Sequence, residues 1–343
     1  MPAKRCLQAS AVVLASSLFL GHPARSGEID QRCVAEVKEK GEPAWKTVES
    51  FVENIGVVFR DERVDRTDEG GKTVESKHTA EWSLCWNRPA RLRLLERRDL
   101  AADRRNSYVV NPRYRFELSK PSDREPYHLD SGQRFAPKRA QSYDLREEQF
   151  RDLLEAGIRV YGIKLSTLMV DKEFKLDRAQ YIADSKSEPK RVLLEWRYLG
   201  SEGGRTRRAG GIYTAELNPA NSWQVDRTEV RIPARADWRG WKQEVSYQPD
   251  GGDVPFPSKV HIAFSLARAK LTVDSVYTFE KPTTCQRSEE EFFLPYYGIS
   301  ENALGYFGAS SWPRWIVSAG CLCAAGLALF YVRIRRRRKL TDM

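Results

Sequence analysis

The sequence is poor in the residues that most often build catalytic and metal centres. It has four histidines and six cysteines in 343 residues, and no two cysteines form a CxxC pair. The histidines are scattered, so the ligand spacing of a zinc site is absent. No GxSxG, HExxH, P-loop or GxGxxG motif occurs. We therefore name no catalytic, cofactor-binding or metal-binding residue and expect no cofactor.

The histidines also lack the neighbours that would activate a nucleophile. His261 stands between Val260 and Ile262 in an alternating segment, which places it on the outer face of a strand. His78 lies in a similar segment with no Cys or Ser arrangement beside it. His261 is interpreted as a solvated strand residue.

The chain also lacks a basic surface within its main body. The formal net charge is +10, but three basic residues lie in the first 26 and a net five positive charges lie in the last 11. Subtracting 3 and 5 from 10 leaves about +2 for residues 27–332. Because the basicity belongs to the two ends, nucleic acid is not an expected partner.

The N-terminus has the three parts of a secretory signal. Lys4 and Arg5 precede the short apolar run Ala11–Leu20, and small residues at Ala24 and Ser26 suit cleavage before residue 27. The apolar run is short for a membrane span. Residues 1–26 are therefore predicted to be a signal peptide, and an uncleaved anchor is the alternative.

The C-terminus has the pattern of a single membrane anchor. Residues 315–332 are an uncharged run of 18, followed by four consecutive arginines within the tail 333–343. This length fits a transmembrane helix, and the positive-inside rule leaves the tail cytoplasmic. A buried core helix is the alternative, but it would not end in such a cluster. The bulk of the chain is thus expected on the periplasmic or extracytoplasmic side of the cell membrane, with membrane lipid as partner of the helix.

The cysteines divide in the same way. Cys6 leaves with the signal peptide, and Cys321 and Cys323 lie in the predicted span. The exported part retains three, which allow one disulfide and one free thiol, or an intermolecular bond. All three pairings remain open; the residues concerned are Cys33, Cys85 and Cys285.

Two segments of the exported part have helical periodicity. Residues 44–59 place a stripe of large apolar side chains on one face. Residues 142–163 carry a second stripe and open with Asp144 and Glu147, which resemble a capping box. The first stripe consists of Trp45, Val48, Phe51, Val52, Ile55 and Phe59, and the second of Phe150, Leu153, Leu154, Ile158 and Tyr161.

Most of the remaining chain alternates as strands do. About eight to ten strands are predicted, in residues 75–86, 90–99, 107–120, 191–200, 211–232, 259–267 and 271–281. The last two are separated by a short turn, as in a hairpin, and 211–232 turns at Asn218–Asn221. These elements predict an α+β domain at 27–285, in which a curved, mainly antiparallel sheet wraps one or two helices as an incomplete barrel.

A helix followed by antiparallel strands and the hairpin at 211–232 resembles the lipoprotein-carrier fold of the LolA/LolB type. This resemblance covers about residues 40–285 and carries no catalytic residue. It implies a half-barrel able to hold an apolar ligand such as a lipid or an acyl chain.

A second resemblance is to uncharacterised planctomycete-type exported proteins. Two segments carry it, an NPRYxFxL pattern and a later acidic-aromatic stretch that precedes the span. The matching residues are Asn111, Pro112, Arg113, Tyr114, Phe116 and Leu118, then Glu291, Phe292, Leu294, Tyr297, Gly298, Ile299 and Glu301. Ser300 and Asn302 stand where the family tends to have prolines. The resemblance implies an anchored topology. Because residues 286–314 lie between the last predicted strand and the span, they are predicted to be a juxtamembrane tether. Whether Phe292, Phe293 and Tyr297 dock on the domain is left open.

Two functions remain. The first is a membrane-anchored cell-envelope protein with an outward-facing binding or scaffold domain, whose half-barrel takes an apolar ligand. The alternative is an envelope hydrolase whose site is assembled from dispersed residues, for which His78, His128 and His261 are the best candidates. Six tryptophans either line the ligand cavity or pack in the core; they are Trp82, Trp86, Trp196, Trp223, Trp238 and Trp241. The sequence does not indicate a protein partner.

Overall fold

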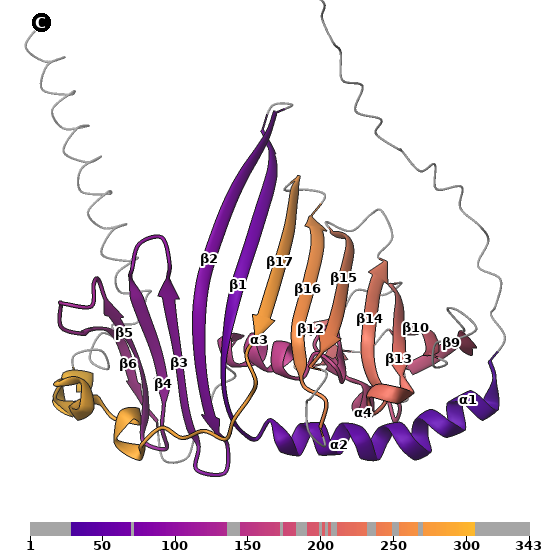
Figure 1. The fold of residues 1–343 in the computed structure, drawn as a ribbon, viewed down its shortest axis with the longest axis horizontal. Coiled ribbons are helices and arrows are strands. Elements are labelled where there is room, and N and C mark those ends of the chain that lie inside the picture. The colour runs from indigo at the N-terminus through magenta and orange to yellow at the C-terminus, as the bar shows by residue number, and fades with distance from the viewer. Residues whose placement is uncertain are drawn as a thin grey trace, which may run out of the picture.

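One large antiparallel sheet organises the computed structural model of the chain (Figure 1). The structure describes residues 29–69, 72–135, 145–171, 174–182, 191–198, 201–202, 205–206, 211–231, 238–248, 254–266 and 270–305. The 13 strands stand in the order β6-β5-β4-β3-β2-β1-β17-β16-β15-β14-β13-β10-β9. Their bounds are β1 Asn54–Glu69, β2 Lys72–Asn87, β3 Leu92–Asp99, β4 Arg105–Val110, β5 Tyr114–Lys120, β6 His128–Arg134, β9 Phe174–Ile182, β10 Arg191–Tyr198, β13 Ile212–Asn218, β14 Gln224–Arg231, β15 Trp238–Tyr247, β16 Pro257–Leu266 and β17 Leu271–Phe279. Two small hairpins lie outside it, β7 (Arg159–Val160) with β8 (Ile163–Lys164), and β11 (Ser201–Glu202) with β12 (Arg205–Thr206).

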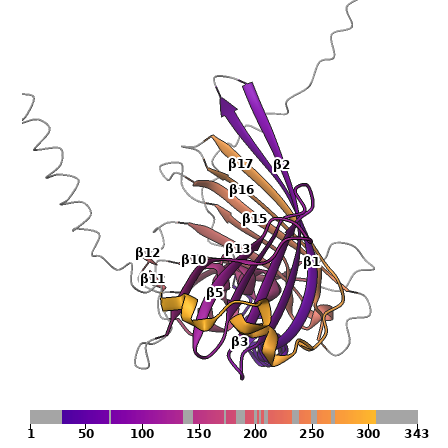
Figure 2. The same ribbon diagram turned by 90° about the vertical axis from the view of Figure 1, so that its left-hand side faces the viewer.

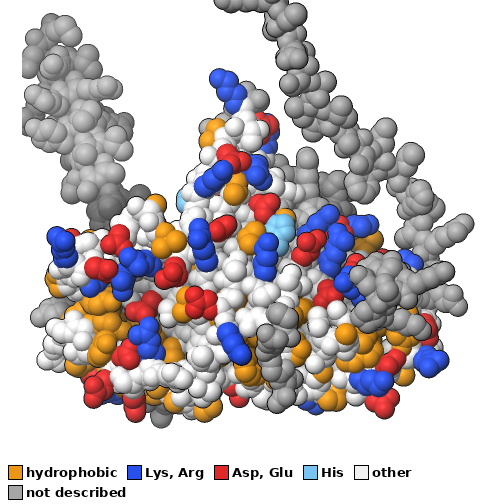
Figure 3. All heavy atoms as spheres, viewed as in Figure 1, with side chains coloured by type: hydrophobic (Ala, Val, Ile, Leu, Met, Phe, Trp, Pro, Cys, Tyr) orange, Lys and Arg blue, Asp and Glu red, His pale blue; other side chains and the backbone are white. Residues whose placement is uncertain are grey.

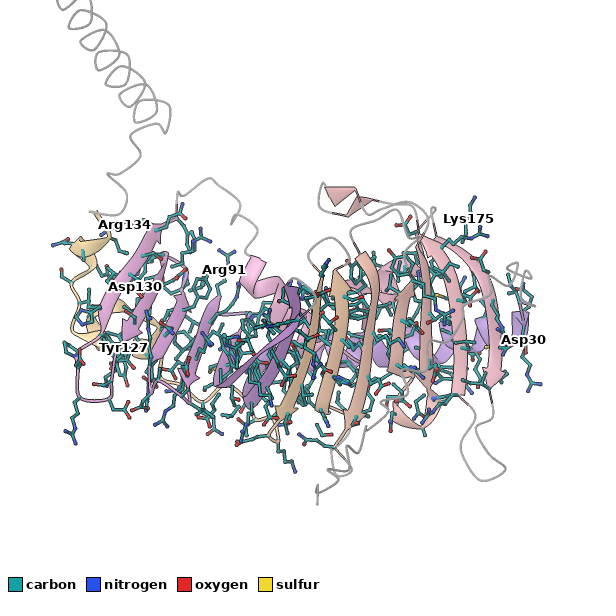
Figure 4. All side chains as sticks on the ribbon, turned by 90° about the horizontal axis from the view of Figure 1, so that it is seen from above. Asp30, Arg91, Tyr127, Asp130, Arg134 and Lys175 are labelled. Atoms are coloured by element: carbon teal, nitrogen blue, oxygen red, sulfur yellow. A yellow bond between two sulfur atoms is a disulfide. The ribbon has the colours of Figure 1, made fainter. Side chains whose placement is uncertain are left out.

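The sheet extends in two directions from its centre. Strands β1 to β6 follow one another outward on one side, and β17 back to β9 form the other side. The two halves meet where β1 pairs with β17, in a register that sets Phe59 opposite Phe279. Seen from above, Asp130 and Arg134 on β6 mark one edge, and Lys175 on β9 marks the other (Figure 4).

The helices gather on one face of the sheet, which we call the concave face. The first helix runs from α1 (Gln31–Glu36) through a π-helical turn (Val37–Gly41) into α2 (Glu42–Phe51) and lies along one end of the strands (Figure 1). Two more follow, α3 (Leu145–Leu154) and α4 (Leu165–Leu168). Trp45 fixes the first helix, because its side chain is fully buried and its indole N–H donates to the carbonyl of Trp223 at 2.8 Å.

Two apolar clusters fill the space between the helices and this face. One lies under α1, α2 and α4 and includes Trp45, Trp196, Tyr213 and Trp241. The other lies under α3 and includes Phe59, Trp86, Leu153, Phe256 and Phe279. An open, curved antiparallel sheet against few helices is the predicted α+β architecture (Figure 2).

The opposite, convex face of β2–β6 is covered by the chain that follows β17. Three 3-10 turns lie there, Glu289–Phe292, Leu294–Tyr297 and Glu301–Ala303. Phe292, Leu294 and Leu304 are buried against Val109 and Phe116. Residues 286–305, called the docking segment below, therefore pack on the domain, which answers the question left open for Phe292, Phe293 and Tyr297. The rest of the predicted tether, 306–314, lies outside the described residues.

The two motif segments of the second resemblance meet at this interface. The Asn111 amide donates to the carbonyl of Phe292 at 2.7 Å, while its oxygen accepts from the backbone N–H of Tyr114 at 2.9 Å. The Tyr114 hydroxyl donates to Glu301 at 2.8 Å and accepts from the N–H of Leu294 at 3.3 Å. These polar residues are thus explained by the docking of one segment on the other.

A disulfide fastens the docking segment to the sheet. Cys85 on β2 is bonded to Cys285, and their Cα atoms are 5.1 Å apart. Cys33 is the free thiol and is fully buried in α1. Burial, followed by the charges of Asp30 and Glu36, raises the pKa of this thiol to about 11. Of the three pairings that the sequence allowed, the structure selects 85 with 285.

Two predicted helices are shorter than their stripes suggested. The first was expected over 44–59, but α2 ends at Phe51 and β1 begins at Asn54. The β-branched residues after Asn54 favour a strand, so Ile55 and Phe59 reach the core from the sheet. In the second segment α3 ends at Leu154, and a hairpin with Tyr161 and Gly162 at positive φ follows.

The predicted strands are largely confirmed, but eight to ten were predicted and the sheet has 13. Strands β1, β6, β9 and β15 were not predicted. The hairpins β13–β14 and β16–β17 form as predicted. Strand β1 was missed because its apolar half was assigned to a helix, and its other half, Asp61–Glu69, is rich in charge. The predicted signal peptide and membrane span lie outside the described residues. Within the described part of the chain, no helix is both long and apolar enough to cross a membrane.

Candidate binding surface on the concave face

An aromatic surface lies on the concave face where α3 crosses β1, β2 and β17. Phe59 and Trp82 are directly paired across β1 and β2, and their rings stack at 6.1 Å. Phe150 of α3 packs on Trp82 at 4.9 Å, and Tyr277 of β17 packs on Phe59 at 6.3 Å. We call these four residues the aromatic surface.

This surface is only partly covered by the protein. Phe59 is buried, whereas Trp82, Phe150 and Tyr277 lie at the margin of the cluster and are only partly buried. An apolar ring left partly exposed beside a packed core offers contact area to an apolar molecule. The side of the sheet under α1 and α2, by contrast, is filled by its own side chains.

Arginines flank the aromatic surface on the next strand. Trp82 pairs with Arg97 across β2 and β3, and Trp86 pairs with Arg93. The Arg97 guanidinium lies 5.6 Å from the Trp82 ring centre, and that of Arg93 lies 5.3 Å from Trp86. Cation–π contacts of this kind hold a guanidinium flat on a ring and leave its edge for other partners.

An acidic side chain lies on the same face, one row along the strands. Asp61 is directly opposite Ala80 on β2 and Tyr277 on β17. Burial raises the pKa of the Asp61 carboxyl, and the nearby Trp82 indole and the charges of Arg63 and Arg97 oppose this only in part. Burial and then the Asp61 charge raise the pKa of Tyr277 to about 12.

Three polar atoms at this site are buried without a hydrogen-bond partner among the described residues. They are Asp61 Oδ1, Trp82 Nε1 and Arg97 Nε. The Trp82 indole lies near enough to the Asp61 carboxyl to lower its pKa, but no hydrogen bond of normal geometry joins the two side chains. Buried polar atoms are usually satisfied by protein, water or a ligand. A molecule with an apolar chain and a polar head would satisfy such atoms while covering the aromatic rings.

The sequence named no site residue, and it gave no means of finding these. Alternation within residues 90–99 showed a strand, but the pairing of Arg97 with Trp82 depends on register. Asp61 lay beyond the predicted first helix, in a segment that was not assigned to a strand.

The tryptophans of the sequence analysis lie mostly in the core. Four are buried: Trp86, Trp196, Trp223 and Trp241. Trp82 alone of these six contributes to the aromatic surface among the described side chains, because the side chain of Trp238 lies outside them.

The histidines that were candidates for a hydrolytic base are far apart. His128 on β6 and His78 on β2 are four strands apart, roughly 19 Å, and His261 on β16 lies three strands from β2, roughly 14 Å. His261 also lies on the convex face, as predicted from alternation, where its ring is 2.7 Å from Asp274. The described residues hold no group of three His, Cys, Asp or Glu side chains placed to bind a metal ion.

Comparisons with known proteins give no assignment. No protein-family model matches the chain, and no curated protein matches it. A DUF1329 family protein from Desulfovibrio piger aligns with a TM-score of 0.36 and 9% identity, over 75% of this chain and 98% of that one. A Vibrio parahaemolyticus domain described as an outer membrane lipoprotein-sorting protein aligns with a TM-score of 0.34 and 8% identity, over 76% and 98%. Because both TM-scores are below 0.5, these two matches carry no argument about the fold or the function of this chain.

Proposed function

We propose that this protein is a membrane-anchored cell-envelope protein whose exported domain binds an amphipathic ligand, such as a lipid or an acyl chain, on its concave face. The observation that carries the proposal is the partly exposed aromatic surface with unpaired polar atoms of Asp61 and Arg97 beside it. The apolar part of the ligand covers the side chains of Trp82, Phe150 and Tyr277. The polar head lies toward Asp61 and Arg97.

The disulfide supports an exported domain. Disulfides such as Cys85–Cys285 persist in oxidising compartments and are rare in the cytosol. Translocation by the N-terminal signal, and retention by the span at 315–332, deliver the domain to that side of the membrane. A fusion of alkaline phosphatase after residue 310 is expected to be active, and an inactive fusion would refute the outward orientation.

The packing of the docking segment supports a position of the exported domain close to the membrane. Leu304 is buried on the convex face, and the predicted span begins at Trp315. The eleven residue-to-residue steps from 304 to 315 span at most about 40 Å when fully extended. The ligand surface is therefore held near the bilayer from which an apolar ligand would come.

Ligand binding is tested with the full chain in amphipol and a fluorescent long-chain fatty acid as probe. Trp82→Ala removes a large part of the contact area and is expected to weaken binding about tenfold or more. Tyr296→Ala is the matched control, because Tyr296 is an exposed aromatic of the docking segment on the opposite face. Native mass spectrometry of the wild-type protein is expected to show bound lipid.

Two results would overturn the proposal. One is a wild-type protein that neither carries lipid nor binds the probe. The other is equal binding by the Trp82→Ala and Tyr296→Ala variants, which would place the ligand elsewhere. The hydrolase alternative has no supporting observation, since its three histidine candidates are remote from one another.

A further inference from the structure

Strands β1 and β2 form an arm that rises beyond the neighbouring strands (Figures 1 and 2). Each is 16 residues long, and they pair with each other over their whole length. On its other side β2 pairs with β3 only from Ala80 to Asn87, and a single bond from Leu100 reaches Thr79. The outer edge of residues 72–78 has no strand beside it among the described residues.

This edge is open to solvent. All seven residues from Lys72 to His78 are exposed, including Val74, one of the few large exposed apolar side chains, at 47%. An open strand edge presents unpaired backbone N–H and C=O groups, which readily pair with another strand. The sheet's other two edges differ, since β9 is partly covered by backbone pairing at Ile29 and Asp30, and β6 is interrupted by a bulge.

The charged side chains along this edge are complementary to those of a second, antiparallel copy of the same edge. On the convex side of the arm, Glu75 and Lys77 are two residues apart, with Ser76 between them. Within one chain these exposed side chains already form ion pairs, Lys77 with Glu75 at 3.2 Å and Arg66 of β1 with Glu75 at 3.0 Å, so association would share or exchange these contacts between the copies. When two copies of the edge pair antiparallel about Ser76, each Glu75 lies directly opposite Lys77 of the other copy. Centring the pairing on Glu75 or on Lys77 instead would place like charges opposite each other, which is destabilising.

We propose that two copies of this chain associate through the open edge of β2, antiparallel and about a two-fold axis at Ser76. The backbone groups of residues 72–78 then pair between copies, and the two 13-stranded sheets become continuous. Two Glu75–Lys77 pairs set the register on the convex side. On the concave side each Val74 meets His78 of the second copy, which covers the exposed apolar side chain.

Non-specific pairing of exposed strand edges needs no particular register, whereas the proposed dimer requires one. Charged residues on an edge normally oppose pairing with unrelated strands, and here they admit the one partner whose charges are reversed in order. A closed two-fold contact of this kind uses each edge once and stops at a dimer. The proposed dimer contact does not involve the aromatic surface, so its test is independent of the test of ligand binding.

The test measures self-association of the full chain in detergent by sedimentation equilibrium. Wild-type protein is expected to dimerise. Glu75→Lys and Lys77→Glu each turn two attractive pairs into repulsive ones, which raises the dissociation constant roughly thirtyfold. The double variant E75K/K77E restores opposite charges between the copies in the same register. Because it leaves a lysine opposite Arg66 of its own chain, it is expected to recover most, but not all, of the wild-type affinity.

Glu62→Lys is the control. Glu62 forms a similar exposed ion pair with Arg60 at 2.8 Å, but it lies on β1, one strand in from the edge, so its reversal should leave association unchanged. A wild-type protein that stays monomeric would overturn the proposal. A double variant no better than the single ones would overturn the register centred on Ser76.

Discussion

The docking segment offers the sharpest test of how the domain is held together. The side chain of Leu294 is fully buried on the convex face, in the same cluster as Phe116 and Leu118. Leu294→Ala removes its buried methyl groups and leaves a cavity, and replacements of this kind cost about 2–5 kcal/mol of unfolding free energy. Tyr296, two residues on, is 56% exposed, and Tyr296→Ala should cost no more than about 1 kcal/mol.

Urea unfolding of both variants, followed by near-ultraviolet circular dichroism, measures the difference. Both changes lie in the same 3-10 turn, so any effect on that turn's own conformation is shared between them. If both variants lose the same free energy, Leu294 does not stabilise the domain and residues 286–305 are a tether with little packing energy. A large loss for Leu294→Ala alone establishes them as part of the domain.

Three further predictions concern single contacts. Replacing Cys85 and Cys285 by serine should lower the unfolding free energy by about 2–4 kcal/mol, which urea unfolding would detect; no change relative to wild type would contradict it. Tyr114→Phe leaves the buried N–H of Leu294 without its acceptor and should cost about 1–3 kcal/mol; a stability equal to wild type would show that water replaces the hydroxyl. Because burial raises the folded-state pKa of Asp61, its contribution to stability is complete below its unfolded pKa of about 4 and is lost as the pH rises through the folded value. Asp61→Asn should therefore be more stable than wild type at about pH 8, with the difference shrinking toward about pH 4; a difference that grows as the pH falls would refute this sign.

The sequence predicted the fold class because alternation and turn residues are local signals. The β16–β17 hairpin and the turn at Asn218–Asn221 are each determined by residues close together in the sequence, and both are present in the structure. The first helix was extended too far because Ile55 and Phe59 continue a helical stripe by coincidence of spacing. A period of 3.6 and a period of 2 both fit a short apolar run, and tertiary pairing with Trp86 and Trp82 decided for the strand.

The binding surface was beyond reach of the sequence for a different reason. Trp82 and Arg97 are 15 residues apart, and Phe59 and Phe279 are 220 apart (279 minus 59), yet each pair is directly opposite in the sheet. Which of these residues face each other depends on strand order and register, and neither is encoded in any local stretch. The same holds for Asn111 and the docking segment, whose contact explains two motifs that the sequence presented as unrelated.

The spread of charge over the face seen in Figure 3 agrees with a nearly neutral body. Positive and negative side chains alternate across the sheet and on the arm, without a large area of one sign. This mixture is typical of a solvent-exposed protein surface without a large charged patch.

The central position of the β1–β17 pairing has a consequence for how the chain is made. Residues 54–69 leave the ribosome early, but their partner 271–279 follows some 200 residues later. Until then β1 has a long unpaired edge at the position that later becomes the middle of the sheet. Each half of the sheet can meanwhile form only as a separate antiparallel meander. Contacts so distant in sequence form slowly, and an unfinished half-sheet with a bare edge is prone to aggregate. Synthesis should thus leave a window, ending when residue 279 emerges, in which this protein depends most on a folding assistant.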